Sequence, residues 1–281
     1  MFEIVRKEVL NPLVKLMEID APYIAKKAQP GQFIILRIDD DGERIPLTIA
    51  DYDAEKGTIT IIFQEVGKTT KILGAMKEGE KLLDFVGPLG VASHLDGLRK
   101  VAVIGGGLGT AIAFPQAKKL HSLGVEVHSI IGFRNKELII LEKEMEAVSN
   151  RLSITTDDGS NGKKGFVTEV LKKLIDDGNN YDMVIAIGPL IMMKMVCKLT
   201  KQYNINTVVS MNPVMIDGTG MCGGCRVTVG GKTKFACVDG PDFNGHEVDF
   251  DEAMRRQLMY KREEKTSSDN HLCKLGGIEN A

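Results

Sequence analysis

The chain has 281 residues, of which 43% are hydrophobic and 26% are charged, and its formal net charge is −2. A chain of this length and composition predicts a globular protein of two or three domains, because one core seldom supports so many residues. The balanced charge, without a basic run, argues against nucleic acid or an anionic membrane surface as a partner. No stretch has the roughly 18 uncharged apolar residues that a membrane-spanning helix needs.

Residues 1–98 are predicted to form an antiparallel β-barrel. Short β-rich runs alternate with turn signals, and only residues 68–76 have helical character. Many short strands without intervening helices favour a closed or sandwiched sheet. The strands are expected within residues 31–38, 47–53, 57–66 and 80–89.

Residues 99–207 change to an alternation of strand and helix, which predicts a parallel sheet with helices on both faces. The stretch 100–120 is typical of a strand, a glycine turn and a helix. Further strands are expected within 125–133, 152–158 and 181–189, and further helices within 138–148, 166–175 and 189–203. The alternation stops near residue 206. We therefore assign residues 208–250 to a cysteine-containing domain and 251–281 to a short charged helix with a flexible tail.

The glycine turn favours a dinucleotide site. Gly105, Gly106, Gly107 and Gly109 lie where a strand passes into a helix. A backbone without side chains admits a phosphate, and the helix N-terminus supplies N–H donors. The stricter fingerprint is incomplete, because Thr110 stands at the third glycine position and no acidic residue ends the next strand. A tight turn that only serves helix packing is the alternative.

Two later turns strengthen the prediction of a nucleotide site. Asp157 and Asp158 end one strand, and Gly188 and Pro189 end another. Open parallel sheets bind ligands at the carboxyl ends of their strands, which is where all three turns belong.

Three of the five cysteines lie close together, which favours reduced thiols in a metal site over a disulfide framework. Together with a charged N-terminus that lacks an apolar signal core, this predicts a cytoplasmic protein. Plant-type [2Fe–2S] sites space their ligands as C-x4-C-x2-C, with a fourth cysteine later. Cys222, Cys225 and Cys237 fit the last three positions, and Asp217 occupies the first. A carboxylate is a hard donor suited to ferric iron, so we expect Asp217 to be the fourth ligand.

Two alternatives to this cluster remain open. Three cysteines and a carboxylate also suit a structural zinc ion, since C-x2-C is common to both metals. In the second alternative Asp217 only caps a turn, with water or Cys273 as the fourth ligand, although Cys273 lies 36 positions beyond Cys237. Cys197 and His128 are expected to be core residues. No hydrolytic set is present, and no catalytic side chain is assigned.

The order of these parts resembles the ferredoxin–NADP reductase superfamily, in which the barrel carries FAD and the second domain a nicotinamide dinucleotide. A cysteine loop directly after the second domain narrows the resemblance to iron–sulfur electron-transfer subunits, such as that of class B dihydroorotate dehydrogenase. The stretches 211–227 and 235–252 are most similar to the small subunit of NADH-dependent reduced ferredoxin:NADP oxidoreductases, also described as a sulfide dehydrogenase subunit.

The resemblance implies two flavin-binding stretches in the barrel. In the first, which comprises Arg44, Pro46, Leu47 and Thr48, the threonine hydroxyl is expected near the flavin N5 and the leucine on the ring. Arg44 stands one position earlier than the phosphate-binding arginine of the family. An ordinary edge strand is the alternative. The second stretch, with Gly67, Thr69 and Thr70, is expected to hold the pyrophosphate at a helix start.

The resemblance also implies an electron-transfer subunit that connects NAD(H), FAD and a [2Fe–2S] cluster. Its partner would be a larger flavin and [4Fe–4S] subunit that exchanges electrons with ferredoxin. A subunit of dihydroorotate dehydrogenase B, or of a sulfide or polysulfide reductase, is the alternative. Outside this class, a flavin-free, zinc-bearing binding module is a further alternative.

Overall fold

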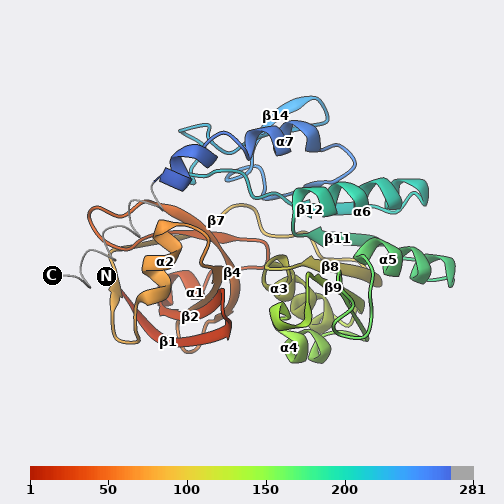
Figure 1. Cartoon of the computed structure of the whole chain (residues 1–281), viewed down its shortest axis with the longest axis horizontal. Coiled ribbons are helices and arrows are strands. Elements are labelled where there is room, and N and C mark those ends of the chain that lie inside the picture. Colours follow the sequence, from red (N-terminus) through yellow and green to blue (C-terminus); the bar gives the residue numbers. More distant parts are fainter. Residues whose placement is uncertain (267–281) are drawn as a thin grey trace.

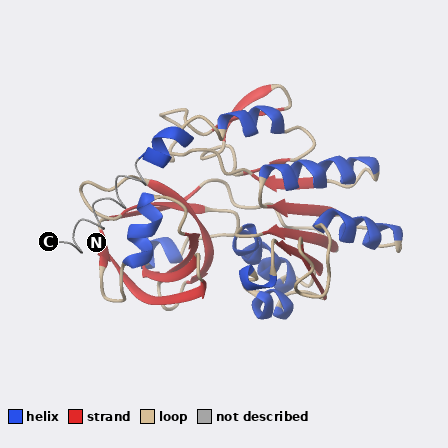
Figure 2. Cartoon of the chain, viewed as in Figure 1, coloured by secondary structure: helices blue, strands red, loops and turns tan. Residues whose placement is uncertain are grey.

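A computed structural model describes residues 1–266 of the chain. Figure 1 shows a β-barrel beside an α/β part, and the C-terminal segment lies across the top of both. Figure 2 shows that the strands gather in these two parts and that the C-terminal segment is mostly loop. No helix within residues 1–266 is long and apolar enough to cross a membrane.

The N-terminal barrel is a seven-stranded antiparallel sheet of order β6-β1-β2-β5-β4-β3-β7. Its edge strands are separated in the chain only by Leu83, so the sheet is nearly closed. Ile59, Ile61 and Phe63 occupy alternate positions of one strand and have no exposed surface. Together with buried side chains of the short helices α1 and α2, they form the core of the barrel. The elements are β1 (Phe2–Asn11), β2 (Val14–Asp20), α1 (Pro22–Ala25), β3 (Phe33–Arg37), β4 (Ile45–Asp53), β5 (Thr58–Gln64), α2 (Lys68–Ala75), β6 (Lys81–Leu82) and β7 (Asp84–Leu89). The predicted barrel is confirmed.

The α/β part is a six-stranded sheet of order β10-β9-β8-β11-β12-β15, parallel except for the edge strand β15. Its elements up to residue 210 are β8 (Lys100–Gly106), α3 (Gly109–Ser122), β9 (Glu126–Phe133), α4 (Glu142–Ala147), β10 (Arg151–Thr156), α5 (Val167–Asp176), β11 (Met183–Ile187), α6 (Leu190–Gln202) and β12 (Thr207–Ser210). Helices α3 and α4 pack on one face and α5 and α6 on the other, as predicted.

The helix predicted over 138–148 is wrong in its first half. A 3-10 turn, η1 (Lys136–Leu138), comes first, and the helix α4 begins only at Glu142. Leu141 adopts a left-handed conformation, with φ of 55°. Ile140 and Leu141 are both buried, so the extended backbone delivers two apolar side chains to the core before the helix starts.

The C-terminal segment contains a hairpin of β13 (Arg226–Val229) and β14 (Lys232–Phe235), the strand β15 (Asp242–Asn244) and the helix α7 (Phe250–Arg256). Val227, Ala236, Phe243 and Phe250 share one core with the inner side of α6. The strands β12 and β15 both lie beyond residue 206, and they extend the six-stranded sheet on the side of β11. The predicted charged helix is confirmed as α7, and the tail from residue 267, including Cys273, lies outside the described residues.

Candidate functional site

The four predicted cluster ligands lie in one loop region. Cys225 and Cys237 are buried, with their sulfurs 3.2 Å apart, whereas Cys222 is exposed. The Asp217 carboxylate accepts hydrogen bonds from the N–H groups of Thr219 (3.0 Å) and Cys222 (2.9 Å) and from the Cys222 thiol. The loop thus places Asp217 beside Cys222, and Cys225 beside Cys237.

The donors form two pairs, Asp217 with Cys222 and Cys225 with Cys237. Among residues 1–266, no three His, Cys, Asp or Glu side chains converge on one point as a site for a single metal ion. Two pairs are the arrangement that a binuclear iron–sulfur cluster requires, because each iron takes two protein ligands. The two pairs of donors thus fit a [2Fe–2S] cluster.

The surroundings shift the pKa of the Asp217 carboxylate and the pKa of the Cys237 thiol in opposite directions. The N–H of Thr219, with the further donors of the loop, lowers the pKa of Asp217, so this carboxylate is ionised. Burial and the neighbouring Cys225 thiol raise the pKa of Cys237 to about 12. The Cys237 thiol thus has a low acidity without a metal, and iron binding would displace its proton.

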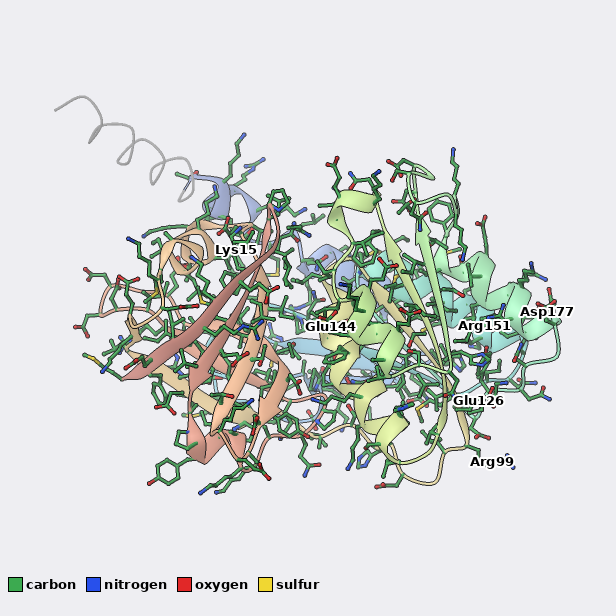
Figure 3. The ribbon with its side chains drawn as sticks, turned by 90° about the horizontal axis from the view of Figure 1, so that it is seen from below. Lys15, Arg99, Glu126, Glu144, Arg151 and Asp177 are labelled. Atoms are coloured by element: carbon green, nitrogen blue, oxygen red, sulfur yellow. The ribbon has the colours of Figure 1, made fainter. Side chains whose placement is uncertain are left out.

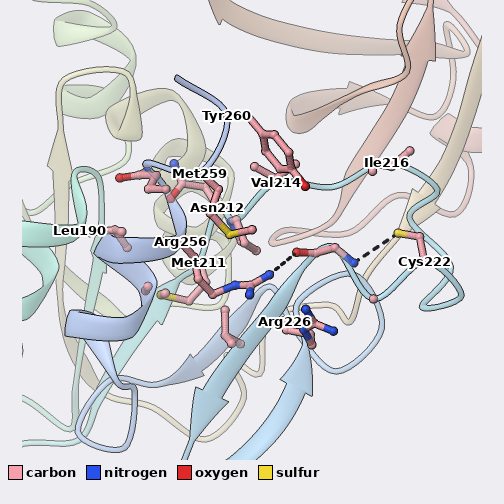
Figure 4. Close-up of a pocket in the computed structure, with 16 residues that line it drawn as sticks. Leu190, Met211, Asn212, Val214, Ile216, Cys222, Arg226, Arg256, Met259 and Tyr260 are labelled. Carbon is pink, nitrogen blue, oxygen red and sulfur yellow. Dashed lines mark hydrogen bonds between the residues drawn. The ribbon is translucent and has the colours of Figure 1, made fainter. Parts of the chain in front are cut away.

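A cavity of about 210 Å³ lies beside the loop, and Figure 4 shows its lining. Arg256 of α7 donates to the carbonyl of Gly224 (3.1 Å), and the N–H of Gly224 lies 3.4 Å from the Cys222 sulfur. The side chains of Met259 and Tyr260 border the same space. Helix α7 and the residues after it thus brace the predicted cluster loop and form an apolar surface next to it.

The glycine turn lies at the carboxyl end of β8, as predicted, and two of its glycines are required by packing against backbone. A Cβ on Gly105 would lie 2.7 Å from the Thr110 Cα, and one on Gly109 2.3 Å from the Ile187 carbonyl oxygen. A Cβ on Gly106 would instead meet the flexible side chain of Met192, with its sulfur at 2.4 Å. Gly107 differs, because its φ is +55° and a Cβ there would meet nothing within 4 Å. The packing alternative accounts for Gly105 and Gly109, and Gly107 faces the open space that a phosphate needs.

The three predicted nucleotide turns follow one another along the carboxyl edge of the sheet. Gly188 packs against Gly106, with 3.0 Å between its ideal Cβ and the Gly106 Cα, and Pro189 precedes α6. The N–H of Asp157 donates to Phe133 at the end of β9 (3.0 Å), and Asp158 follows it. Since Gly107 N–H also donates to the end of β9, at Gly132 (2.8 Å), the turns are contiguous. The Ser160 side chain, with its N–H, lowers the pKa of Asp158.

The first flavin stretch lies on β4 and leaves an accessible face. Arg44, Pro46, Leu47 and Thr48 are all half-buried, whereas Ile49 and Ala50 directly after them are buried. Thr48 pairs with Phe33 of β3. The Arg44 guanidinium lies 3.8 Å from Asp84, which also binds Arg37 (2.8 Å). The half-buried leucine and proline provide an apolar surface on which a flat ring can lie.

The second flavin stretch is next to the first. Thr69 at the start of α2 donates to Glu43 (2.6 Å), one residue before Arg44. The Thr70 hydroxyl accepts from the N–H of Val66 and of Gly67, each at 3.0 Å, so it caps the helix. A Cβ on Gly67 would meet nothing within 4 Å, which leaves this helix end open to a ligand.

Cys197 and His128, which were expected to be core residues, are both buried. His128 is buried and bonds Tyr181 (2.8 Å) and Glu126 (3.0 Å) at the amino end of the sheet. Figure 3 shows Glu126, Arg99 and Arg151 on the side of the α/β part farthest from the barrel. Cys197 is buried, and burial raises its pKa to about 12.

Sequence reasoning missed one group, the carboxyl of Asp242. Its Oδ1 atom is inaccessible to solvent and has no hydrogen-bond partner. Its Oδ2 atom accepts from Ser93 (2.6 Å) and Gln116 (3.1 Å), which lie far away in the chain. No local pattern signals such a group, because all its partners come from other segments.

The fold and the loop define a class: a ferredoxin reductase-like electron-transfer protein with an iron–sulfur segment. Residues 212–249 match the model for the iron–sulfur cluster binding domain of dihydroorotate dehydrogenase B. A solved structure of the NADH-dependent reduced ferredoxin–NADP oxidoreductase, described for flavin-based electron bifurcation, has a TM-score of 0.92 and 43% identity, covering 97% of this chain and 98% of that one. The ferredoxin reductase of carbazole 1,9a-dioxygenase shares the fold, with a TM-score of 0.62 at 20% identity.

Two relatives with similar sequences show the family to which the chain belongs. The dihydroorotate dehydrogenase B electron-transfer subunit homolog of Thermotoga maritima is 44% identical over 99% of this chain and 98% of its own length. The probable electron-transfer subunit of Methanocaldococcus jannaschii is 35% identical over 92% and 93%. The chain belongs to the family of dihydroorotate dehydrogenase B electron-transfer subunits and their homologues. The expectation of an oxidoreductase subunit with FAD, an iron–sulfur cluster and NAD(H) is supported, as is that of a partner subunit.

Proposed function

We propose that this chain passes electrons between NAD(H), FAD and a [2Fe–2S] cluster and delivers them to a larger subunit, as in an NADH-dependent reduced ferredoxin:NADP oxidoreductase. The observation that carries the proposal is the two-pair arrangement of Asp217, Cys222, Cys225 and Cys237 in a loop beside a ferredoxin reductase-like fold. Bound FAD would accept a two-electron hydride and release single electrons, which suits a one-electron cluster.

The chain itself supplies the sites. The accessible face at Arg44, Pro46, Leu47 and Thr48 would hold the flavin ring, and the helix start at Gly67, Thr69 and Thr70 its pyrophosphate. The turns at the carboxyl edge of the sheet would hold NAD(H), with Gly107 nearest the phosphates. These roles follow the proposed division into a barrel (1–98), a nucleotide domain (99–207), a cluster domain (208–250) and a C-terminal helix and tail (251–281).

The surface around the cluster loop supports a partner at this end of the molecule. Exposed apolar side chains gather there, and Met221, next to Cys222, is 89% exposed. The others are Val214, Ile216, Val238, Leu258, Met259 and Tyr260. Exposed apolar groups in such number mark an interaction surface. We propose that a larger flavin and [4Fe–4S] subunit, which exchanges electrons with ferredoxin, covers it.

The decisive experiment is an absorption and EPR spectrum of the purified chain before and after anaerobic addition of NADH. Flavin bands that bleach, together with the signal of a reduced [2Fe–2S] cluster, are expected. A colourless protein with one bound zinc ion would refute the proposal.

The second candidate is the electron-transfer subunit of a dihydroorotate dehydrogenase, favoured by the match over residues 212–249. Isolation of the complex with its partner distinguishes the two. A partner with [4Fe–4S] clusters that reduces NADP supports the first function, whereas a partner that oxidises dihydroorotate supports the second.

A further inference from the structure

The Asp242 carboxyl lies where three parts of the molecule meet. Ser93, which donates at 2.6 Å, belongs to the segment that leaves the barrel, and Gln116, which donates at 3.1 Å, belongs to α3. Ser210 at the end of β12 is the register partner of Asp242 in the adjoining β15. Asp242 itself begins β15, five residues after Cys237. One carboxyl oxygen thus joins the barrel side, the nucleotide side and the segment that carries the predicted cluster.

Backbone contacts around the carboxyl make this junction tight. The N–H of Val91 donates to the carbonyl oxygen of Gly240 (2.7 Å), and the N–H of Met211 donates to the carbonyl oxygen of Pro241 (2.8 Å). The N–H of Ser93 donates to Pro30 on the barrel rim (2.9 Å). A Cβ on the neighbouring Gly31 would lie 2.2 Å from the Ser93 hydroxyl oxygen, so no larger residue fits. The position of the Asp242 carboxyl is therefore determined from several sides.

A carboxyl in this place is costly, which calls for a reason. Burial raises the pKa of Asp242 in spite of its hydrogen bonds from Ser93 and Gln116, and its Oδ1 atom has no partner. Buried polar groups without partners are rare in folded proteins and tend to occur at functional sites. The exposed His94, which adjoins Ser93, acts on the carboxyl by its charge and lowers its pKa.

We propose that Asp242 is a positioning residue that fixes α3, and with it the glycine turn, against the flavin side of the barrel for hydride transfer. This rests on the proposed function. Gln116 is about two turns beyond the N-terminus of α3, which starts at Gly109, so a shift of α3 moves the predicted nicotinamide site directly. Hydride transfer is sensitive to such shifts, since a misplacement of about 1 Å can cost about 100-fold in rate.

The test is anaerobic stopped-flow reduction of the flavin by saturating NADH, in native protein and in the variants D242A, D242N and K118M. D242A should reduce its flavin about tenfold more slowly, with unchanged flavin content, cluster EPR signal and NADH affinity. D242N keeps the shape and an oxygen that accepts from Ser93 and Gln116, so its rate should be within about twofold of native. Lys118 pairs with Asp51 across the same two parts at the surface (2.7 Å), and K118M should leave the rate unchanged.

A D242A rate equal to the native one, or an equal loss in D242A and K118M, would overturn the proposal. A merely structural role would lower the melting temperature but leave the rate of the folded, flavin-loaded fraction unchanged. If D242A does not fold, S93A and Q116M each remove one donor, and normal rates in both overturn it. If native protein binds no flavin, or NADH does not reduce it, the proposed function has failed instead.

Discussion

The Asp217 carboxylate caps its own loop and is also the predicted fourth ligand of the cluster. It caps its own loop by accepting from Thr219 and Cys222, and its side chain stands beside the Cys222 thiol. A capping carboxylate has further lone pairs available, so capping does not exclude ligation of iron. The turn-cap alternative and the ligand hypothesis are therefore compatible in geometry, and only loss of the carboxylate separates them.

We predict that D217A purifies with much less cluster iron than the native chain, because one iron loses a protein ligand. The measurement is iron and acid-labile sulfide per chain. D239A is the matched control, since Asp239 also caps this segment, by accepting from the N–H of Phe235 (2.7 Å), and is not one of the predicted ligands. Equal iron content in D217A and D239A would show that Asp217 only caps a turn.

The same residue allows a prediction about the reduction potential. Replacing Asp217 by Cys keeps the negative charge of the ligand set, so the midpoint should move far less than the roughly 250 mV or more that separates Rieske from plant-type centres. Voltammetry of the native protein and D217C measures the shift. A change as large as the Rieske one would contradict a charge-conserving exchange.

At the scale of elements, the glycine turn is a contact between β8, α3 and β11 before it is a binding loop. Gly109 lies so close to the Ile187 carbonyl that the start of α3 depends on it, whereas Gly107 faces open space. Packing and binding are thus divided between neighbouring glycines. The motif alone does not show this division, because both roles call for the same residue.

G109A and G107A should therefore fail in different ways. G109A should lower the free energy of unfolding by about 3 kcal/mol, since its methyl group would meet backbone 2.3 Å away. G107A should cost only about 1 kcal/mol for its left-handed backbone but should weaken NADH binding. Urea unfolding and NADH titration measure the two effects. Equal losses of stability would mean that both glycines serve packing alone.

At the scale of the whole molecule, the carboxyl ends and the amino ends of the strands in the α/β sheet differ in role. The carboxyl ends of the strands face the barrel and carry the predicted nucleotide turns, whereas at their amino ends the buried His128 and Tyr181 connect to the exposed Glu126 and the half-buried Lys100. Burial lowers the pKa of His128, so the folded protein binds its proton less readily than the unfolded chain does. Stability from this group is present above the unfolded pKa of about 6.5 and decreases as the pH falls below it.

The melting temperature should therefore decrease from pH 7.5 towards pH 5, and H128Q should show a weaker dependence over that range. Differential scanning calorimetry at several pH values tests this. H121Q, at an exposed position on α3, should leave the native pH profile unchanged. A native-like profile in H128Q would assign the acid sensitivity to other groups.

Much of the architecture was predictable because its signals are local. Short β-rich runs between turn signals, such as residues 57–66, indicated barrel strands, and the repeated exchange of apolar strand and amphipathic helix from residue 100 indicated a parallel sheet. The helix predicted over 138–148 failed in its first half because burial of Ile140 and Leu141 outweighed helix propensity. The spacing of Cys222, Cys225 and Cys237 pointed to their juxtaposition because a short loop keeps close residues close.

The class of each part, the order of the parts and the residues predicted to hold the cluster could thus be inferred from local patterns. How the parts meet is visible in the folded chain alone. Ser93 and Gln116 come together on Asp242 from segments up to 149 positions apart, and β12 and β15 extend the sheet of the α/β part. The physical reason is that local patterns encode which face of an element is apolar, whereas the pairing of distant polar groups depends on how those faces pack.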